Sequence, residues 1–172
     1  TGASSGLGAG MAREFAKRGH DLGLCARRLD RLESLKAELE AAHPGIRVAI
    51  RTLDVTDYTQ VFEVVRAFRD DFGHLDRMVV NAGIGQGMPV GKGGFERNKA
   101  IIETNLIAAL AQCEAAMEVF GAQDRGHLAV IASVSAIRGF RGGLTEDAPE
   151  AEAVAKEIDE MPEPDEAGRV KF

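Results

Sequence analysis

The chain has no tryptophan, one tyrosine and only two cysteines among its 172 residues. Cys25 and Cys113 are far apart and form no C-x-x-C pair, so neither a disulfide framework nor a thiolate metal site is expected. The four histidines do not cluster, and each lies beside a turn signal, which argues against a histidine metal centre. We therefore expect no metal, and reduced thiols indicate an intracellular protein.

Long apolar runs and basic stripes are also missing. No apolar run approaches the roughly 20 residues that span a bilayer, and no signal peptide is recognisable. The net charge of −6 resides at the end of the chain, since residues 144–172 hold three basic and ten acidic residues. Such a run is typical of a solvated helix face or tail. We expect a cytoplasmic protein with neither nucleic-acid nor membrane partners.

What the chain does have is the composition of one globular domain over residues 1–172, with 45% hydrophobic and 28% charged residues. Helices are expected over residues 7–15, 29–39, 57–72 and 95–120. Strands are expected over residues 22–26, 46–53, 75–81 and 127–133. Strands that alternate with helices predict an α/β fold with a parallel sheet. Either Thr56 or Asp57 is expected to cap the third helix.

The last of these helices carries a long apolar stripe at helical spacing. We expect this stripe to face the core rather than a cofactor. Its members are Ile101, Ile102, Leu106, Leu110, Met117 and Phe120.

The chain opens on TGASSGLG, which places Gly2, Gly6 and Gly8 at the spacing of a dinucleotide-binding turn. In such a turn Gly2 permits a tight bend, Gly6 lets the backbone approach a pyrophosphate, and Gly8 lets the following helix pack closely. A glycine pattern taken alone also fits a plain structural turn.

Three further motifs follow in order: NAG at Asn81–Gly83, Asn105 within ETNLIAAL, and VIASVSAIRG around Ser133. Together with the glycine turn they resemble the short-chain dehydrogenase/reductase family from residue 1 to about residue 143. The resemblance implies a Rossmann-type doubly wound parallel sheet with helices on both faces, in three α/β/α layers. It also implies hydride transfer between a nicotinamide and a carbonyl or alcohol substrate, in a homodimer or homotetramer.

The resemblance also implies which residues hold the cofactor. The phosphates lie against Ser4 and the backbone of Ser5 to Leu7. At the end of the second strand, where an acidic residue would select NAD(H), the chain has Arg27 and Arg28, and guanidinium groups suit a 2′-phosphate. We therefore prefer NADP(H), with NAD(H) as the alternative. A solvated helix start is the other interpretation of the two arginines, although positive charge is unfavourable there.

Two later segments complete the predicted cofactor site. In the family, the residues at Asp54 and Val55 contact adenine through a side chain and the backbone respectively, although a carboxylate before Asp57 also suits helix capping. The turn formed by Asn81, Ala82 and Gly83 supports the adenosine side of the cofactor. The full predicted set is Gly2, Ser4, Ser5, Gly6, Leu7, Gly8, Arg27, Arg28, Asp54, Val55, Asn81, Ala82 and Gly83.

The predicted catalytic residues are Asn105 and Ser133. Asn105 is a polar residue on an apolar helix face, where an amide needs partners, and a satisfied helix kink is the alternative. The resemblance implies that it helps to hold a water in a proton relay. Ser133 ends an apolar strand and would point at the crevice beyond the carboxyl edge of the sheet, where it hydrogen-bonds the substrate oxygen. Ser135 is its rival.

The chain departs from the family where a Tyr-x-x-x-Lys element should stand, at Gly142–Ala148. Its one tyrosine is Tyr58, and Lys156 has Glu152 four residues before it. We expect an interruption near 143–148, either a deletion or a junction between parts of a longer chain. We also expect a strand before Thr1. The alternative function is a catalytically inactive nucleotide-binding or regulatory module.

Overall fold

The computed structural model describes residues 1–85, 87–133 and 156. Helices and strands alternate along this part of the chain, as the sequence predicts. Their order is α1 (Gly6–Lys17), β1 (Leu22–Ala26), α2 (Leu29–Ala42), β2 (Val48–Thr52), α3 (Tyr58–Phe72), β3 (Arg77–Val80), α4 (Phe95–Ile102), η1 (Glu103–Ile107), α5 (Ala108–Gln123) and β4 (His127–Val130).

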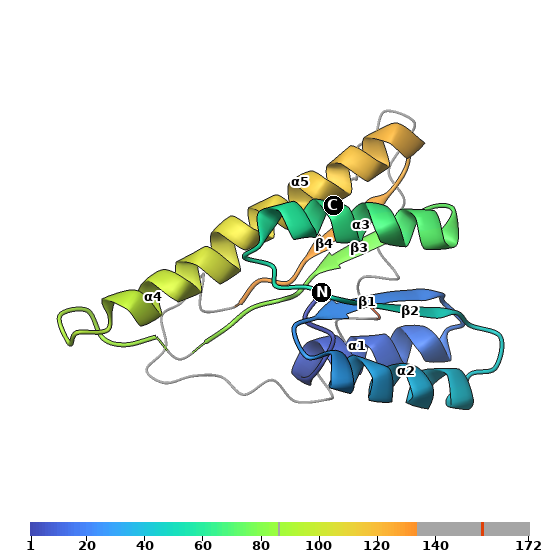
Figure 1. Cartoon of the computed structure of the whole chain (residues 1–172), viewed down its shortest axis with the longest axis horizontal. Helices are drawn as coiled ribbons and strands as arrows, with labels where there is room; N and C mark the ends of the chain where they lie inside the picture. Colours follow the sequence, from blue (N-terminus) through green and yellow to red (C-terminus); the bar gives the residue numbers. More distant parts are fainter. Residues whose placement is uncertain (86, 134–155, 157–172) are drawn as a thin grey trace.

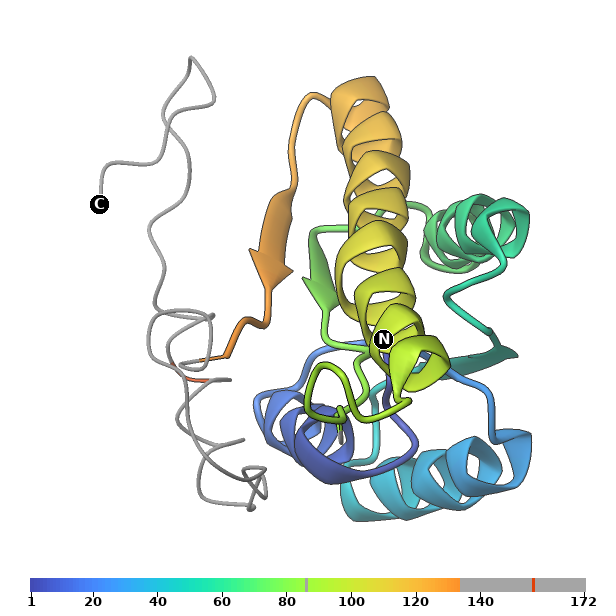
Figure 2. The same ribbon diagram turned by 90° about the vertical axis from the view of Figure 1, so that its left-hand side faces the viewer.

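The elements form three layers (Figures 1 and 2). Helices α1 and α2 lie on one side of the strands, and α3 with the long α4–α5 helix lies on the other. Met11, Leu32 and Leu39 belong to the core on the first side, whereas Val61 and Phe120 belong to the core on the second. The predicted Rossmann-type α/β fold with helices on both faces is confirmed.

The strands form two parallel pairs within the described residues. Strand β1 pairs with β2, with Leu22 opposite Val48, and β3 pairs with β4, with Arg77 opposite His127. The backbone hydrogen bonds identified between the two pairs all involve the first three residues of the chain. The N-terminal nitrogen of Thr1 donates to the carbonyl of Val79 at 2.9 Å, and Ala3 N–H donates to the carbonyl of Cys25 at 3.2 Å.

Several predicted boundaries change. Strands β2, β3 and β4 are shorter than the patterns indicate. Leu75 lies outside β3 because the Gln123 side-chain amide accepts from its N–H and donates to its carbonyl, both at 2.9 Å. Asp57, not Thr56, caps α3, since the Asp57 carboxylate accepts from Gln60 N–H at 3.1 Å.

Most of the apolar stripe of the long helix faces away from the core, so our prediction that it is buried was wrong. Of the expected core residues, only Phe120 is buried, while Ile102, Leu106, Leu110 and Met117 are 55–60% exposed and Ile101 is half-buried. The buried face is instead built from Ala108, Gln112, Ala115, Ala116 and Val119. Small side chains let the helix approach α3 and the strands closely, and a pattern that follows only large apolar residues misses this face.

By length and composition alone, the helix over residues 95–123 could cross a membrane, with a mean hydropathy of 1.2 over its most apolar window. A core helix of an α/β protein passes the same test. Here α5 packs on α3, β3 and β4, and Glu118 on α5 forms an ion pair with Arg66 on α3 at 2.7 Å. We therefore interpret the helix as part of the α/β layers.

Candidate cofactor site

A pocket of about 340 Å³ opens where β1, β2 and β3 end. Such carboxyl ends are the usual ligand site of a parallel sheet. Nine of the thirteen predicted cofactor residues line it; Gly6, Leu7, Gly8 and Asn81 do not. The lining consists of Gly2, Ser4, Ser5, Ala26, Arg27, Arg28, Leu53, Asp54, Val55, Thr56, Ala82, Gly83, Ile84, Ala100 and Thr104.

Glycine is favoured for a different physical reason at each of the three positions Gly2, Gly6 and Gly8 of the first turn. Gly2 has φ +67°, and a Cβ there would lie 2.9 Å from the Cα of Ala82. A Cβ on Gly8 would lie 2.6 Å from the carbonyl oxygen of Gly2, so α1 can pack on the turn only because this residue is glycine. Gly6 has φ +54°, and a Cβ there would meet no atom within 4 Å. Its left-handed backbone, not crowding, favours glycine at this position.

The start of α1 presents backbone N–H groups at the edge of this turn. Ser5 is the N-cap but makes no capping hydrogen bond through its side chain, and no acidic residue lies in the first helical turn. Leu7 is buried and offers only its backbone. The positive end of the helix dipole is therefore not offset by a local carboxylate, which suits an anion such as a phosphate.

Arg28 reaches across the pocket to the serines of the glycine turn. Its Nη2 donates to Ser4 Oγ at 3.0 Å and to Ser5 Oγ at 2.7 Å, and its Nε donates to Ser4 Oγ at 3.3 Å. Both Arg27 and Arg28 are exposed. The end of β1 thus supplies two guanidinium groups to the pocket, next to the serine hydroxyls.

Asp54 is the one carboxylate in the pocket lining. It accepts from the N–H of Thr56 at 3.0 Å and from the Thr56 hydroxyl at 2.8 Å. These two hydrogen bonds, together with the charge of Arg27, hold the pKa of Asp54 below its ordinary value. Asp54 therefore stabilises the turn before α3, while the helix cap is Asp57. The side chain of Val55 is buried.

Asn81 lies behind the pocket and connects it to the glycine turn. Its Nδ2 donates to the carbonyl of Thr1 at 2.9 Å. Thr1 Oγ1 in turn accepts from the N–H groups of Asn81 and Ala82, at 3.0 and 2.9 Å. The Asn81–Gly83 turn is thus held against the first residue of the chain.

Asn105 lies in the π-helical segment η1 and is exposed, not on a buried helix face as predicted. Its Oδ1 accepts from Ile84 N–H at 2.9 Å, and its Nδ2 donates to the Ile84 carbonyl at 2.8 Å. Two turns earlier, Asn98 makes the same pair of bonds to the backbone of Met88, at 2.8 and 2.9 Å. The two asparagines therefore hold the segment after β3 along the helix.

Sequence reasoning missed Asn98 and two helix residues of the pocket lining, Ala100 and Thr104. Two asparagines seven residues apart on one helix were the available signal, since this spacing puts them on the same face. Ala100 and Thr104 carry no distinctive chemistry, and only the return of the helix past the strand ends brings them to the pocket.

The remaining predicted residues are placed as follows. Ser133 is exposed and lies just beyond the end of β4. The Tyr58 hydroxyl donates to the Glu103 carboxylate, which raises the pKa of Tyr58. Ser135 and the suspected interruption at 143–148 lie outside the described residues, while Lys156 is described and exposed. Over the described ranges, no three His, Cys, Asp or Glu residues gather in a possible metal site.

The parallel strands, the helices on both faces and the glycine turn define a Rossmann-type α/β protein. A family model described as short chain dehydrogenase matches residues 1–145. The chain therefore belongs to the short-chain dehydrogenase family, as its motifs predict.

An uncharacterized oxidoreductase of Mycobacterium tuberculosis is 54% identical over 142 residues, which are 83% of this chain and 56% of that protein. An NADP-dependent 3-hydroxy acid dehydrogenase of Escherichia coli is 30% identical over 144 residues, again 83% of this chain and 56% of that protein. The chain thus spans about half the length of these curated relatives. A Thermococcus sibiricus alcohol dehydrogenase complexed with 5-hydroxy-NADP aligns with a TM-score of 0.74 and 29% identity, over 91% of this chain and 63% of that chain.

The paired asparagines generate a local prediction. Asn105→Ala is expected to accelerate hydrogen exchange at the Ile84 amide by about fivefold, because a net hydrogen bond is worth about 1 kcal/mol. Asn98→Ala is the matched control, since it removes the equivalent bonds to Met88. We expect it to accelerate exchange at Met88 and not at Ile84. Equal exchange at Ile84 in the parent and in Asn105→Ala would contradict the assignment.

Proposed function

We propose that this chain holds the cofactor of an NADP(H)-dependent oxidoreductase that interconverts carbonyl and alcohol groups. One observation carries the proposal: Arg28 lies within 2.7–3.3 Å of the hydroxyls of Ser4 and Ser5 at the glycine turn. A guanidinium and two hydroxyls at the start of a helix suit phosphate oxygens. When bound, the nicotinamide cofactor supplies the hydride.

The pocket lining offers groups for the adenosine and pyrophosphate parts of this cofactor. Ser4, Ser5 and the N-terminus of α1 would bind the pyrophosphate, and Arg27 with Arg28 would bind a 2′-phosphate. Asp54 and the backbone of Val55 would face the adenine. Ala82 and Gly83 would support its ribose. At the end of β1 the chain has arginine where a carboxylate would select NAD(H), so we favour NADP(H) and keep NAD(H) as the alternative.

We assign the protein's own role in the reaction to residues at the strand ends beyond this pocket. We propose that Ser133, just after β4, hydrogen-bonds the oxygen of a small carbonyl or alcohol substrate. Asn105 would keep the Ile84 segment in place at the rim, and it remains our candidate for holding a relay water. Tyr58 is not our proton donor, because its hydroxyl already donates to Glu103. Both described cysteines are free, which suits the reducing cytoplasm.

The exposed stripe of the long helix supports self-association. Ile102, Leu106, Leu110 and Met117 form one apolar face that no described residue covers well, since each remains 55–60% exposed. We propose that this face joins two copies in a homodimer, or in a homotetramer built from such dimers.

Arg28→Ala is expected to weaken NADPH binding by about 10- to 100-fold, because a hydrogen bond to a charged group is worth about 1.5–3 kcal/mol. NADH, which lacks the 2′-phosphate, is expected to bind the parent and the variant equally. Isothermal titration of both cofactors measures the effect. Arg31→Ala, an exposed arginine in the first turn of α2, is the matched control. Equal losses for NADPH and NADH would remove the assignment of Arg28 to a 2′-phosphate.

Ser133→Ala is expected to lower kcat by about 10²- to 10³-fold, the usual cost of removing one hydrogen-bond donor to an oxygen on which negative charge develops. The dissociation constant for NADPH should not change, since Ser133 does not line the cofactor pocket. NADPH oxidation with a panel of aldehydes and ketones measures the rate. A parent chain that binds NADPH without oxidising it would instead support a nucleotide-binding module.

Leu106→Arg combined with Leu110→Arg is expected to convert the protein to a monomer, because two charges would be buried between apolar faces. Light scattering after gel filtration measures the mass. Val90→Arg, on a loop residue that is 96% exposed, is the control and should leave the mass unchanged. A parent chain that is already monomeric would refute the interface.

A further inference from the structure

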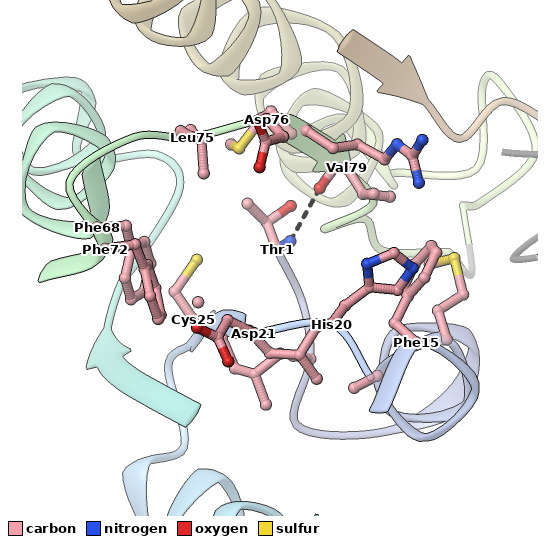
Figure 3. A pocket seen from close by; sticks show the side chains of 18 of the residues that line it. Thr1, Phe15, His20, Asp21, Cys25, Phe68, Phe72, Leu75, Asp76 and Val79 are labelled. Carbon is pink, nitrogen blue, oxygen red and sulfur yellow. Dashed lines mark hydrogen bonds between the residues drawn. The ribbon is translucent and has the colours of Figure 1, made fainter. Parts of the chain in front are cut away.

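The first turn of α3 lies beside the cofactor pocket, whereas later turns of the helix border another space. Residues 54–56 line the pocket, and α3 begins two residues later at Tyr58. Farther along α3, Phe68 and Phe72 line a cavity of about 560 Å³ between β1 and β3, whose lining also includes Thr1 (Figure 3). Tyr58 is therefore at the end of α3 that can influence the pocket.

The π-helical segment η1 of the long helix meets this same end of α3. Thr104 of η1 lines the cofactor pocket, and the next residue is Asn105, our candidate catalytic residue. The structure describes all of residues 95–107, and none of them is buried, whereas Ala108 is fully buried. The core therefore fixes the long helix from Ala108 onward, and the residues before it depend on side-chain hydrogen bonds for their position.

The π turn makes the position of Asn105 sensitive to those bonds. Its backbone hydrogen bonds span five residues instead of four, and such turns are rare and short. Because each residue of an α-helix turns by about 100°, conversion of η1 to a regular helix would rotate the preceding residues by about that angle relative to α5. A rotation of this size would move the Asn105 amide away from the backbone of Ile84, which it now binds.

One side-chain hydrogen bond joins η1 directly to α3. The Tyr58 hydroxyl donates to the carboxylate of Glu103, the first residue of η1, and both side chains belong to half-buried residues. Asn98 and Asn105 instead bind the segment after β3, whose described residues 83–85, 87 and 88 are themselves half-buried or exposed. The bond between Tyr58 and Glu103 is thus the tie from η1 to the helix layer beside the pocket.

The first turn of α3 is in turn bound to the pocket lining. Gln60 Oε1 accepts from the N–H of Asp54 at 3.1 Å, and Gln60 N–H donates to the carboxylate of Asp57 at 3.1 Å. A series of hydrogen bonds and short covalent steps therefore leads from the turn over residues 54–56, through Tyr58 and η1, to Asn105.

We propose that Tyr58 and Glu103 are positioning residues that hold Asn105 in place relative to the adenine end of the cofactor pocket. Their hydrogen bond connects η1 to the turn over residues 54–56, and it favours the π turn over a regular helical turn. Without this bond, Asn105 spends less time bound to Ile84. The effect on catalysis rests on the proposed function, whereas the effect on η1 does not.

Four variants test this role. Tyr58→Phe keeps the ring and removes the hydroxyl, and Glu103→Ala removes the acceptor, whereas Glu103→Gln keeps an acceptor oxygen. The matched control is Glu118→Ala. Glu118 also joins the long helix to α3, through an ion pair with Arg66 at 2.7 Å, but neither of these two residues lines the cofactor pocket.

We expect Tyr58→Phe and Glu103→Ala each to accelerate hydrogen exchange at the Ile84 amide by about fivefold, because each removes one hydrogen bond that holds η1. The double variant should show no further acceleration, since both changes break the same bond. Glu103→Gln should recover most of the protection. Glu118→Ala should leave exchange at Ile84 within about twofold of the parent. Unchanged exchange in Tyr58→Phe, or equal acceleration in Glu118→Ala, would overturn the proposal.

A UV titration of the parent chain tests the hydrogen bond itself. The chain has one tyrosine and no tryptophan, so tyrosinate absorbance reports Tyr58 alone. The bond to Glu103 raises the pKa of Tyr58, so its stabilising effect is present at neutral pH and is lost as the pH rises through that pKa. Tyr58 should therefore ionise at a lower pH in Glu103→Ala than in the parent. Identical titrations would refute the bond.

Turnover separates this inference from the proposed function. In a parent chain that oxidises NADPH, Tyr58→Phe and Glu103→Ala should lower kcat by about 10- to 100-fold, because a misplaced group costs rate. Their NADPH dissociation constants should match the parent's, since neither residue lines the pocket. Unchanged kcat would refute the positioning role. A parent chain that does not oxidise NADPH would contradict the proposed function, while exchange at Ile84 and the titration still decide whether Tyr58 and Glu103 hold η1.

Discussion

The contact between the first residues of the chain and the Asn81–Gly83 turn is the constraint on which the candidate cofactor pocket depends. Asn81 holds the carbonyl of Thr1, and Thr1 Oγ1 accepts from two successive backbone N–H groups of that turn. Gly8 places α1 against the same junction, since a Cβ there would lie 2.7 Å from Asn81 Nδ2. Segments that are far apart in sequence thus meet at one point, and their hydrogen bonds hold the glycine turn beside the pocket.

The long helix makes a second connection of the same kind. Its alanine face packs against α3 and the strands, which brings Ala100 and Thr104 to the pocket. Asn98 and Asn105 then bind the backbone of the segment that leaves β3 through four side-chain hydrogen bonds, and two of these hold Ile84, which lines the pocket. The apolar stripe left outside is therefore a consequence of close packing on the inner face.

Charge completes the site. The arginines at the end of β1, the serine hydroxyls and the start of α1 all present positive potential or hydrogen-bond donors, and Asp54 is already bound to Thr56. Arg27 and Arg28 both line the pocket, so two positive charges are added to this end of the sheet. The pocket is therefore electrostatically arranged for a phosphorylated ligand, which agrees with the family to which the chain belongs.

Much of this protein was determined by its sequence alone. Periodicity located all helices and strands described here, and the ordered motifs identified the family, because local pattern and glycine geometry act over a few residues. Tertiary structure decided the rest. Three features depend on contacts between distant segments. They are the choice of the buried face of the long helix, the hydrogen bonds of Asn98 and Asn105 to the segment after β3, and the cavity between β1 and β3. Those contacts are set by how closely backbones can approach, a property of side-chain size on both partners that one segment's pattern does not contain.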